Sequence, residues 1–395
     1  SISFKIVFGH FFPNSILAAD GEQWQRIRKI LTKAINNTSF DLVIPSIIRN
    51  VAYTLKENEK GSCLANESNS FDLISRIIFD GFHCLAYDWD PETLKFNPES
   101  SELLESCNTI TEAIGDRFLI PYPILWKIPT KKNQRYEKAG KTIREFVDKF
   151  LKEQKEKFQS HKEEIMQIKK RTLLQEMLIA NEAEEESKRL SHDELIDQVA
   201  TLFFGGYDTT STVISFCLNF LARNQNIQDY LRSLLVEAFP NGEEELRINA
   251  LEKITYLSHF VNEVHRICPL ASIPRYCIQD TEINGFSVKK GELVIIDNLG
   301  IGQREDFWNN MKDLEVFRPE RWAEYKPATL EGVIPFGFGG RVCPGKRLAT
   351  YEMKVFLSAA LLKHKIVLRK PGEEFKLTAY IGMNVVGGDI NYERI

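Results

Sequence analysis

A single cysteine in a glycine-rich turn constrains this chain more than any other feature. In the segment 336–345 (FGFGGRVCPG), Arg341 stands two residues before Cys343, and the run that begins at Lys346 favours a helix. The N–H groups at a helix start and a nearby cation both stabilise a thiolate. Such a thiolate ligates metals and donates electrons strongly to iron. A buried cysteine in a Gly-rich loop is the alternative interpretation.

Composition restricts the class of protein. The chain has 395 residues, enough for one large domain, and its net charge of −4 gives no indication of a nucleic-acid partner. Its seven cysteines are scattered without a CxxC pair, which argues against a disulfide framework or a zinc site and for a reducing compartment. No run reaches the roughly 18 apolar residues of a membrane span.

Helical periodicity predicts a mainly α fold with small β-sheets late in the chain. One helix begins near Gly21, and the others are expected over 41–57, 71–87, 99–115, 136–169, 192–223 and 254–267. Ser191 and Glu194 form a capping box at the start of the long apolar helix. Short β-type runs occupy 275–278, 282–288, 293–297, 365–369 and 376–386. For the charged segment 162–189 we expect a solvated helix and a mobile connection, with a partner-binding tract as the alternative.

The long helix carries a second motif, GGYDTT, which begins at Gly205. Two glycines in mid-helix cost roughly 1 kcal/mol each relative to alanine, and they leave room for something flat to come close. Asp208 and Thr209 place an acid beside a hydroxyl, which suits proton transfer through a held water. The alternative is a simple kink, in which the Thr209 hydroxyl bonds back to the preceding turn.

These two motifs resemble those of the cytochrome P450 family, the haem-thiolate monooxygenases, and the resemblance extends along the chain. It implies that haem b lies between the long central helix and the helix that follows the cysteine. Cys343 would ligate the haem iron. Asp208 and Thr209 would be the catalytic pair that delivers protons to dioxygen.

The resemblance also implies which residues contact the haem. Trp24 and Arg28 match the family's Trp-x-x-x-Arg, in which one helical turn puts an indole N–H and a cation on one face, toward a haem propionate. A tryptophan that merely packs is the alternative for Trp24. The full set expected to bind the haem is Trp24, Arg28, Gly205, Arg275, Phe336, Arg341 and Gly345.

A structural charge network is implied as well. Glu263 and Arg266 stand three residues apart on one helix face, which alone is a weak signal, and Arg321 lies in a downstream Pro-Glu-Arg segment. Guanidinium groups bind a carboxylate bidentately and can fix distant segments to each other. In the family this trio is buried behind the haem loop. His265, inside the motif, is interpreted as an ordinary helix residue.

The substrate-facing parts implied by the resemblance are apolar, and a plain apolar core would look the same. They are the Phe-rich opening loop, the long helix around Val199, Phe203 and Phe204, the segment 270–273, and the turn near 381–385. The proline-broken segment 118–129 carries tyrosine and tryptophan and runs into lysines. It is expected to touch a membrane interface, with a packed loop between helices as the alternative.

The expected function is that of a haem-thiolate monooxygenase. It would insert one oxygen atom of O₂ into a lipophilic or amphipathic small molecule, with electrons from an NADPH-dependent cytochrome P450 reductase at the cytosolic face of the endoplasmic reticulum membrane. The long motif spacing indicates a eukaryotic protein, and the composition, which is rich in Asn, Lys and Ile, suggests a fungus. The alternatives are an isomerase or dehydratase acting on a peroxide, against which the acid–alcohol pair argues, and a non-catalytic haem-binding protein.

We expect residues 1–395 to be a single catalytic domain of a longer, membrane-anchored protein. The chain begins with Ser1, and Trp24 follows soon after, whereas family members carry a longer segment before the matching tryptophan. That segment would supply an anchor and the first strands of the sheet. Without those strands, 275–278 and 293–297 would lack pairing partners and form an aggregation-prone edge.

Overall fold

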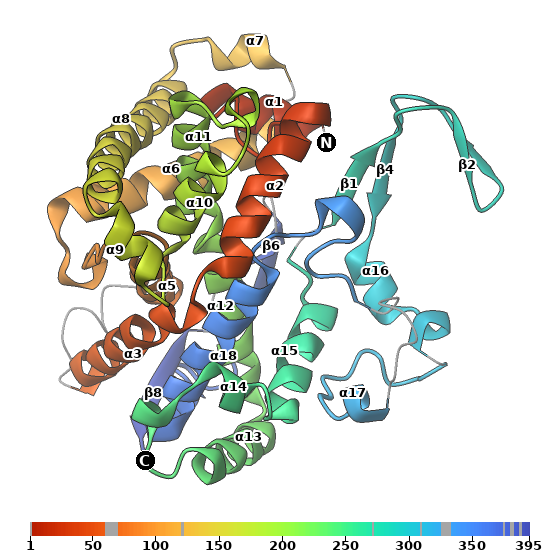
Figure 1. Ribbon diagram of the computed structural model, residues 1–395. Coiled ribbons are helices and arrows are strands. Elements are labelled where there is room, and N and C mark those ends of the chain that lie inside the picture. The colour runs from red at the N-terminus through yellow and green to blue at the C-terminus, as the bar shows by residue number, and fades with distance from the viewer. Residues whose placement is uncertain are drawn as a thin grey trace.

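The computed structural model describes residues 2–59, 70–119, 122–270, 272–308, 310–324, 333–373, 376–379, 383–386 and 389–395. Helices dominate this part of the chain and the strands come late, which confirms the expected fold class (Figure 1).

The helices, in chain order, are α1 (Ile2–Phe11), α2 (Gly21–Asn37), α3 (Val43–Glu59), α5 (Ser70–Tyr87), α6 (Pro98–Leu119), α7 (Pro123–Trp126), α8 (Lys131–Ser160), α9 (Lys162–Gln167), α10 (Leu173–Glu182), α11 (His192–Gly205), α12 (Asp208–Arg223), α13 (Gln225–Ala238), α14 (Ile248–Leu251), α15 (Thr255–Ile267), α16 (Asn298–Gln303), α17 (Arg321–Glu324) and α18 (Lys346–Lys363). The strands are β1 (Ile273–Tyr276), β2 (Thr281–Ile283), β3 (Phe286–Val288), β4 (Leu293–Ile296), β5 (His364–Leu368), β6 (Lys376–Ala379), β7 (Met383–Val386) and β8 (Ile390–Arg394).

The described strands form four antiparallel pairs: β1 with β4, β2 with β3, β5 with β8 and β6 with β7. Asn284 and Gly285 both have positive φ in the tight β2–β3 turn, which is the usual chemistry of a two-residue hairpin. The first two pairs extend to one side of the helical body (Figure 1). Sequence reasoning missed β8, which closes on β5 at the end of the chain.

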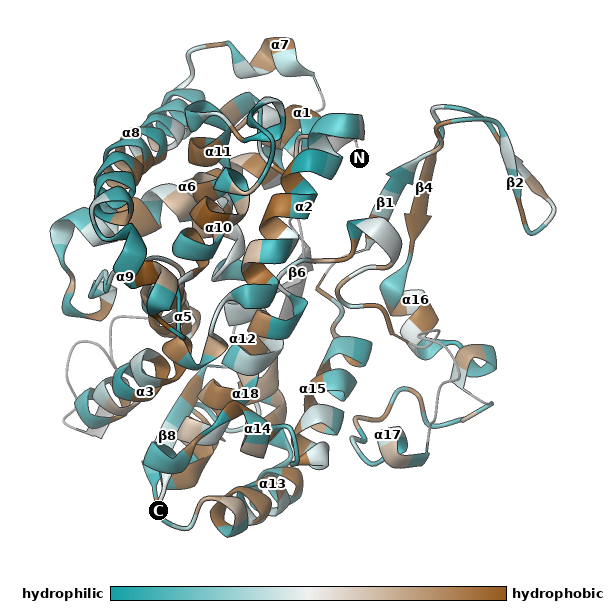
Figure 2. Ribbon diagram, in the orientation of Figure 1, coloured by the Kyte–Doolittle hydropathy of each residue, from teal (hydrophilic) through white to brown (hydrophobic). Residues whose placement is uncertain are grey.

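Two helices form the centre of the body. All residues of α12 from 210 to 222 are buried, and so are all residues of α18 from 351 to 361. A helix that is buried all round lies inside a large core, because no face of it meets water. The outer helix α8 is mainly hydrophilic by comparison (Figure 2). The cysteine motif at 336–345 therefore leads straight into a central helix, α18.

The charged segment 162–189 is more ordered than expected. It contains α10, whose residues Leu173, Leu174, Met177 and Leu178 are buried. A capping box between Thr172 and Gln175 starts this helix, and it packs against α2 and α5. The prediction of a mobile connection was wrong, because flanking charges concealed a short apolar run.

The Phe-rich opening is a helix and not a loop. Phe8, Phe11 and Phe12 are buried, and α1 packs against α6. Phe11 lies so close to α8 that a Cβ at Gly140 would come within 2.7 Å of its ring. These phenylalanines therefore belong to the core, so the expected substrate-facing role of the opening loop was wrong for their side chains.

The long helix expected over 192–223 is interrupted in the middle of the GGYDTT motif. Helix α11 ends at Gly205 and α12 begins at Asp208. The two glycines differ in the space that a side chain would find at their positions. A Cβ at Gly206 would stand 2.6 Å from the ring of Phe82, which is buried, whereas a Cβ at Gly205 would have no heavy atom within 4 Å.

Replacement of Gly206 by alanine should therefore destabilise the protein. The added methyl group overlaps a ring that has no room to move, and overpacking of this kind costs typically 1–3 kcal/mol. Gly205→Ala is the matched control, because it adds the same methyl group in open space. Urea unfolding should show a lower midpoint for Gly206→Ala only. Equal midpoints in the two variants would contradict the assignment.

Candidate functional site

The cysteine loop is closed by its own backbone. The N–H of Cys343 donates to the carbonyl oxygen of Phe336 at 2.8 Å, and the N–H of Val342 donates to that of Gly339 at 3.1 Å. Gly337 and Gly339 have φ of 76° and 70°, a conformation that favours glycine. The glycines thus let the loop turn tightly and present Cys343 immediately before α18.

The thiol of Cys343 lies among donors. The N–H groups of Gly345 and Lys346 both donate to it, and the charge of Arg28 also acts on it. Burial is the larger influence and raises the thiol pKa, although these donors and the arginine lower it. From the sequence we expected the helix start and the cation to stabilise the thiolate, which means a lowered thiol pKa. The protein's own groups instead leave the thiol pKa raised, so that expectation was wrong. Cys343 is nevertheless exposed to solvent as a residue.

Three guanidinium groups converge beside this loop. The Arg341 guanidinium lies 4.0 Å from the centre of the Trp24 ring and donates to Asp20 Oδ1 at 3.1 Å. Burial lowers the pKa of Arg341, Asp20 raises it, and the charges of Arg275 and Arg28 lower it further. The structure therefore brings together residues from α2, β1 and the cysteine loop.

This group of cations suits an anionic ligand. Asp20 is an acid partner of Arg341, and Arg28 has no carboxylate partner in the described part of the chain. A hollow of about 570 Å³ runs along α2 beside Trp24 and Arg28. Three positive charges that share one carboxylate partner, Asp20, among the described residues repel one another, and a ligand with two carboxylates would relieve that repulsion. The haem propionates are such a pair.

The interruption between α11 and α12 exposes the acid–alcohol pair. Asp208 is partly accessible to solvent, and burial nevertheless raises the pKa of its carboxyl to about 6. Thr209 is exposed, and its hydroxyl is 3.5 Å from the carbonyl oxygen of Gly205, at the limit of a hydrogen bond. The hydroxyl is thus only weakly held by the bond that a kinked helix predicts. Because this bond is weak, it does not prevent the hydroxyl from taking part in proton transfer.

Sequence reasoning missed a buried acid near this pair. Glu352 on α18 is almost fully buried, and its Oε2 accepts from the Thr210 hydroxyl at 3.4 Å. Burial raises the pKa of the Glu352 carboxyl well above its ordinary range. The available signal was a lone acid, Glu352, in the mostly apolar stretch 348–361.

Glu263 is the centre of the charge network. Its carboxylate accepts from Arg266 at 2.8 and 2.9 Å, from Arg321 Nε at 2.9 Å and from the indole of Trp322 at 2.9 Å. The N–H of Arg318 also donates to it at 2.9 Å. The side chains of Glu263, Arg266 and Arg321 are all 0% exposed. The structure thus joins the three residues that the two motifs named.

The two arginines extend the network to the backbone. Arg266 donates to the carbonyl oxygens of Gly302 and Leu314 at 2.9 and 2.7 Å, and Arg321 donates to those of Asp313 and Val316 at 2.8 and 2.9 Å. A buried carboxylate and two cations therefore tie α15 to a segment about fifty residues later.

His265 connects this network to the cysteine loop. Its ring is buried and lies 5.5 Å from the ring of Phe336, edge to face. Neither ring nitrogen has a hydrogen-bond partner in the described structure, and burial lowers the pKa of the imidazole to about 4. His265 is therefore a neutral packing residue, as the sequence interpretation had it.

Two residues expected to face a substrate belong to the core. Val199 and Phe203 are 0% exposed, and the Phe203 ring packs 4.5 Å from that of His83 and 5.0 Å from that of Tyr87. Their expected substrate-facing role was wrong, because a helical stripe of apolar residues does not show which side is core. Phe204 is only partly buried and packs against Phe8 at 5.4 Å. Residues 271, 381 and 382 of the other expected segments lie outside the described residues.

A mainly helical body with a presented cysteine and a cationic recess defines a haem-thiolate protein. Comparison with known proteins agrees. The sequence model of the cytochrome P450 family matches residues 3–382. A crystal structure of a cytochrome P450, CYP102L1, superimposes with a TM-score of 0.78 at 19% identity, and covers 100% of this chain and 84% of that one. At that identity the likeness concerns the fold.

Several curated relatives carry the same family name. Rat cytochrome P450 3A18 is 27% identical over 365 residues, which span 90% of this chain and 71% of the rat protein. Pig cytochrome P450 3A29 is 29% identical over 363 residues (88% and 69%), and cytochrome P450 94A1 of Vicia sativa is 25% identical over 386 residues (92% and 71%). The chain belongs to the cytochrome P450 family. It is a haem-thiolate monooxygenase whose cofactor is haem b. The comparisons give no support to a fungal origin.

Removal of the Glu263 carboxylate should destabilise the protein strongly. Glu263→Ala leaves two buried guanidinium groups without their shared acid, and breaking a buried ion pair costs roughly 3–5 kcal/mol. We expect little soluble, haem-loaded protein and a lower melting temperature. Arg304→Ala is the control, because its pair with Asp306 is exposed and should contribute nothing measurable. Normal haem content and melting of Glu263→Ala would contradict the structural role.

Proposed function

We propose that this cytochrome P450 oxygenates a lipophilic small molecule at a membrane surface, with electrons from an NADPH-dependent reductase. The observation that supports this most directly is the acid–alcohol pair at a break between two helices, where Asp208 is partly accessible and Thr209 is exposed. A protein that only bound haem, or only rearranged a peroxide, would have no use for such a proton path.

The residues present fit haem b. Haem supplies a redox-active iron when bound. Cys343 would ligate it, and the donated N–H groups of Gly345 and Lys346 would share the sulfur's negative charge. Arg28, Arg275 and Arg341 would hold the propionates, as a set of cations that have no other common anion. Phe336 would lie against the haem beside the loop that it closes.

The protons come from α12. Asp208 has a pKa near neutrality because burial destabilises its charge, so this carboxyl can take up and release a proton at physiological pH. Thr209, one residue on, can hold a water with its weakly bound hydroxyl. Gly205 contributes by having no side chain, which keeps the space beside Thr209 open.

An apolar surface supports contact with a membrane. Around α7, the side chains of Tyr122 and Ile124 are 65% and 76% exposed, and Leu125 and Ile128 are also exposed. Lysines follow in the next turns, which suits shallow insertion among lipid head groups. Trp126 does not share this role, because it is buried against Arg117. None of the described helices is long and apolar enough to span a bilayer.

The proposed electron donor is a reductase, and the proposed location of the protein is the endoplasmic reticulum. The similarity to animal and plant cytochromes P450 supports a eukaryotic setting. The exposed side of α2 presents Lys29 and Lys33 along the hollow beside Arg28. Basic side chains at this point suit the acidic surface of an electron-donating protein, because opposite charges steer encounter and fix orientation.

Replacement of Thr209 by alanine should uncouple electron flow from product formation. With NADPH, a reductase and a lipophilic substrate, Thr209→Ala should bind haem normally and still consume NADPH, because no haem contact is lost. Product should fall severalfold and hydrogen peroxide should rise, because protons from Asp208 no longer reach oxygen in step with electrons.

Asp208→Asn should show the same uncoupling, and Thr142→Ala, on the distant helix α8, should behave as the wild type. Unchanged coupling in both Thr209→Ala and Asp208→Asn would rule out the proton path. Turnover of an organic hydroperoxide without any reductant, together with no NADPH-dependent product, would instead favour an isomerase or dehydratase.

A further inference from the structure

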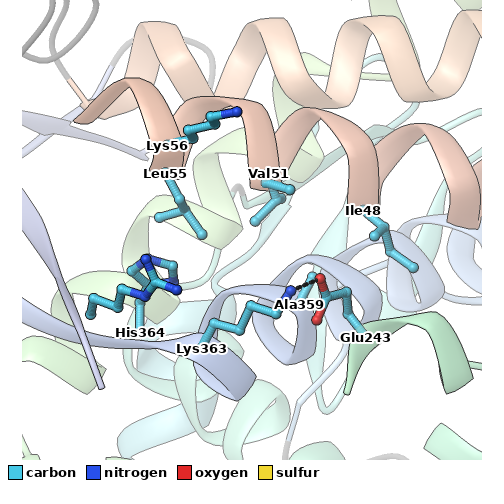
Figure 3. Close-up of a pocket in the computed structure, with 10 residues that line it drawn as sticks. Ile48, Val51, Leu55, Lys56, Glu243, Ala359, Lys363 and His364 are labelled. Atoms are coloured by element: carbon cyan, nitrogen blue, oxygen red, sulfur yellow. Dashed lines mark hydrogen bonds and ion pairs between the residues drawn. The ribbon is translucent and has the colours of Figure 1, made fainter. Parts of the chain in front are cut away.

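A second hollow lies at the far end of α18 from the cysteine loop (Figure 3). Helix α18 runs from Lys346 to Lys363, and 18 helical residues span about 27 Å. The hollow has a volume of about 320 Å³, which is within the range of small-molecule sites. Its lining residues are Ile48, Val51, Ala52, Leu55, Lys56, Glu243, Ala359, Lys363, His364 and Arg394.

One wall of the hollow is apolar. Ile48, Val51, Ala52 and Leu55 recur at the spacing of one helix face on α3, and Ala359 faces them from α18. Leu55 and Val51 point from α3 toward α18 in Figure 3. Ala52 is exposed although it belongs to this wall. Val51, Leu55 and Ala359 are buried, so the apolar surface that the fold leaves uncovered is that of Ala52 and the half-buried Ile48.

The rim of the hollow is cationic. Lys56, Lys363 and Arg394 are exposed lining residues, and Glu243 is the one acid among the lining residues. Glu243 is nearly buried and forms an ion pair with Lys363. Lys56 has no ion-pair partner among the residues that the structure describes. Lys56 thus leaves an uncompensated positive charge at the rim, which favours an anion over a cation.

We propose that this hollow binds an amphipathic anion, namely a carboxylate or phosphate group attached to an alkyl chain. The head group would meet Lys56 at the rim, and the chain would lie against Ala52 and Ile48. The site is separate from the haem recess, because none of the residues that line it is one of the expected haem contacts. It follows from the lining of the hollow and not from the proposed substrate or reductase.

The test uses the haem-loaded protein and decanoate below its micelle concentration, measured by calorimetry. A bulky azole bound at the iron closes the substrate site, and the Soret band reports any displacement of it. Decanoate should still bind, about fourfold more tightly for each added methylene group. Decylamine should bind at least tenfold more weakly. Equal binding of decylamine and decanoate would overturn the proposal.

Two variants locate the binding. Lys56→Glu should weaken decanoate binding at least tenfold, and Ala52→Phe, which fills the hollow from an exposed position, should abolish it. Lys149→Glu, an exposed lysine on α8, is the matched control and should change nothing. Unaltered binding in Lys56→Glu and Ala52→Phe would refute the site, whatever their activity.

Sedimentation with vesicles then separates the two sources of such an anion. Vesicles of phosphatidylglycerol bound by the wild type and released by Lys56→Glu would assign a lipid head group. Binding of monomeric decanoate without any vesicle effect of Lys56→Glu would assign a free fatty acid. Absence of both interactions would contradict the proposal.

Discussion

The carboxylate of Glu263 is the interaction on which the rest of the structure depends. It is fully buried and holds Arg266 of its own helix and Arg321 from a distant segment. A buried charge is tolerable only when it is paired and hydrogen-bonded, and here the partners come from α15 itself and from the segment 318–322. His265, one residue from Arg266, packs its ring against that of Phe336. The carbonyl oxygen of Phe336 in turn accepts a hydrogen bond from the N–H of Cys343.

Helix α18 links three chemically different places. Cys343 precedes its first turn, Glu352 lies buried in its middle against Thr210, and Ala359 and Lys363 line the second hollow near its end. Because residues 351–361 are buried all round, the helix has little freedom to move independently of its neighbours. A ligand in the second hollow would therefore contact α18, the same rigid helix that follows Cys343.

The local motifs could be predicted from sequence, and the packing could not. The cysteine loop and the Glu263–Arg266 spacing are short patterns with a chemical reason of their own, and the capping box at Ser191 formed as its residues indicate. Helix α10 was missed because charges surround its apolar run. Val199 and Phe203 were misassigned because an apolar stripe looks the same toward a core and toward a pocket. The role of Gly206 depends on Phe82, which is more than a hundred residues away.

Carbon monoxide binding to the reduced protein tests the central claim, that Cys343 is the thiolate ligand of the haem. The wild type should show the red-shifted Soret band of thiolate ligation, and Cys343→Ala should lose it. Cys277→Ala, which removes another partly accessible cysteine, should keep the band. A Cys343→Ala protein that retained the band, or a wild type with bound haem that lacked it, would contradict the account.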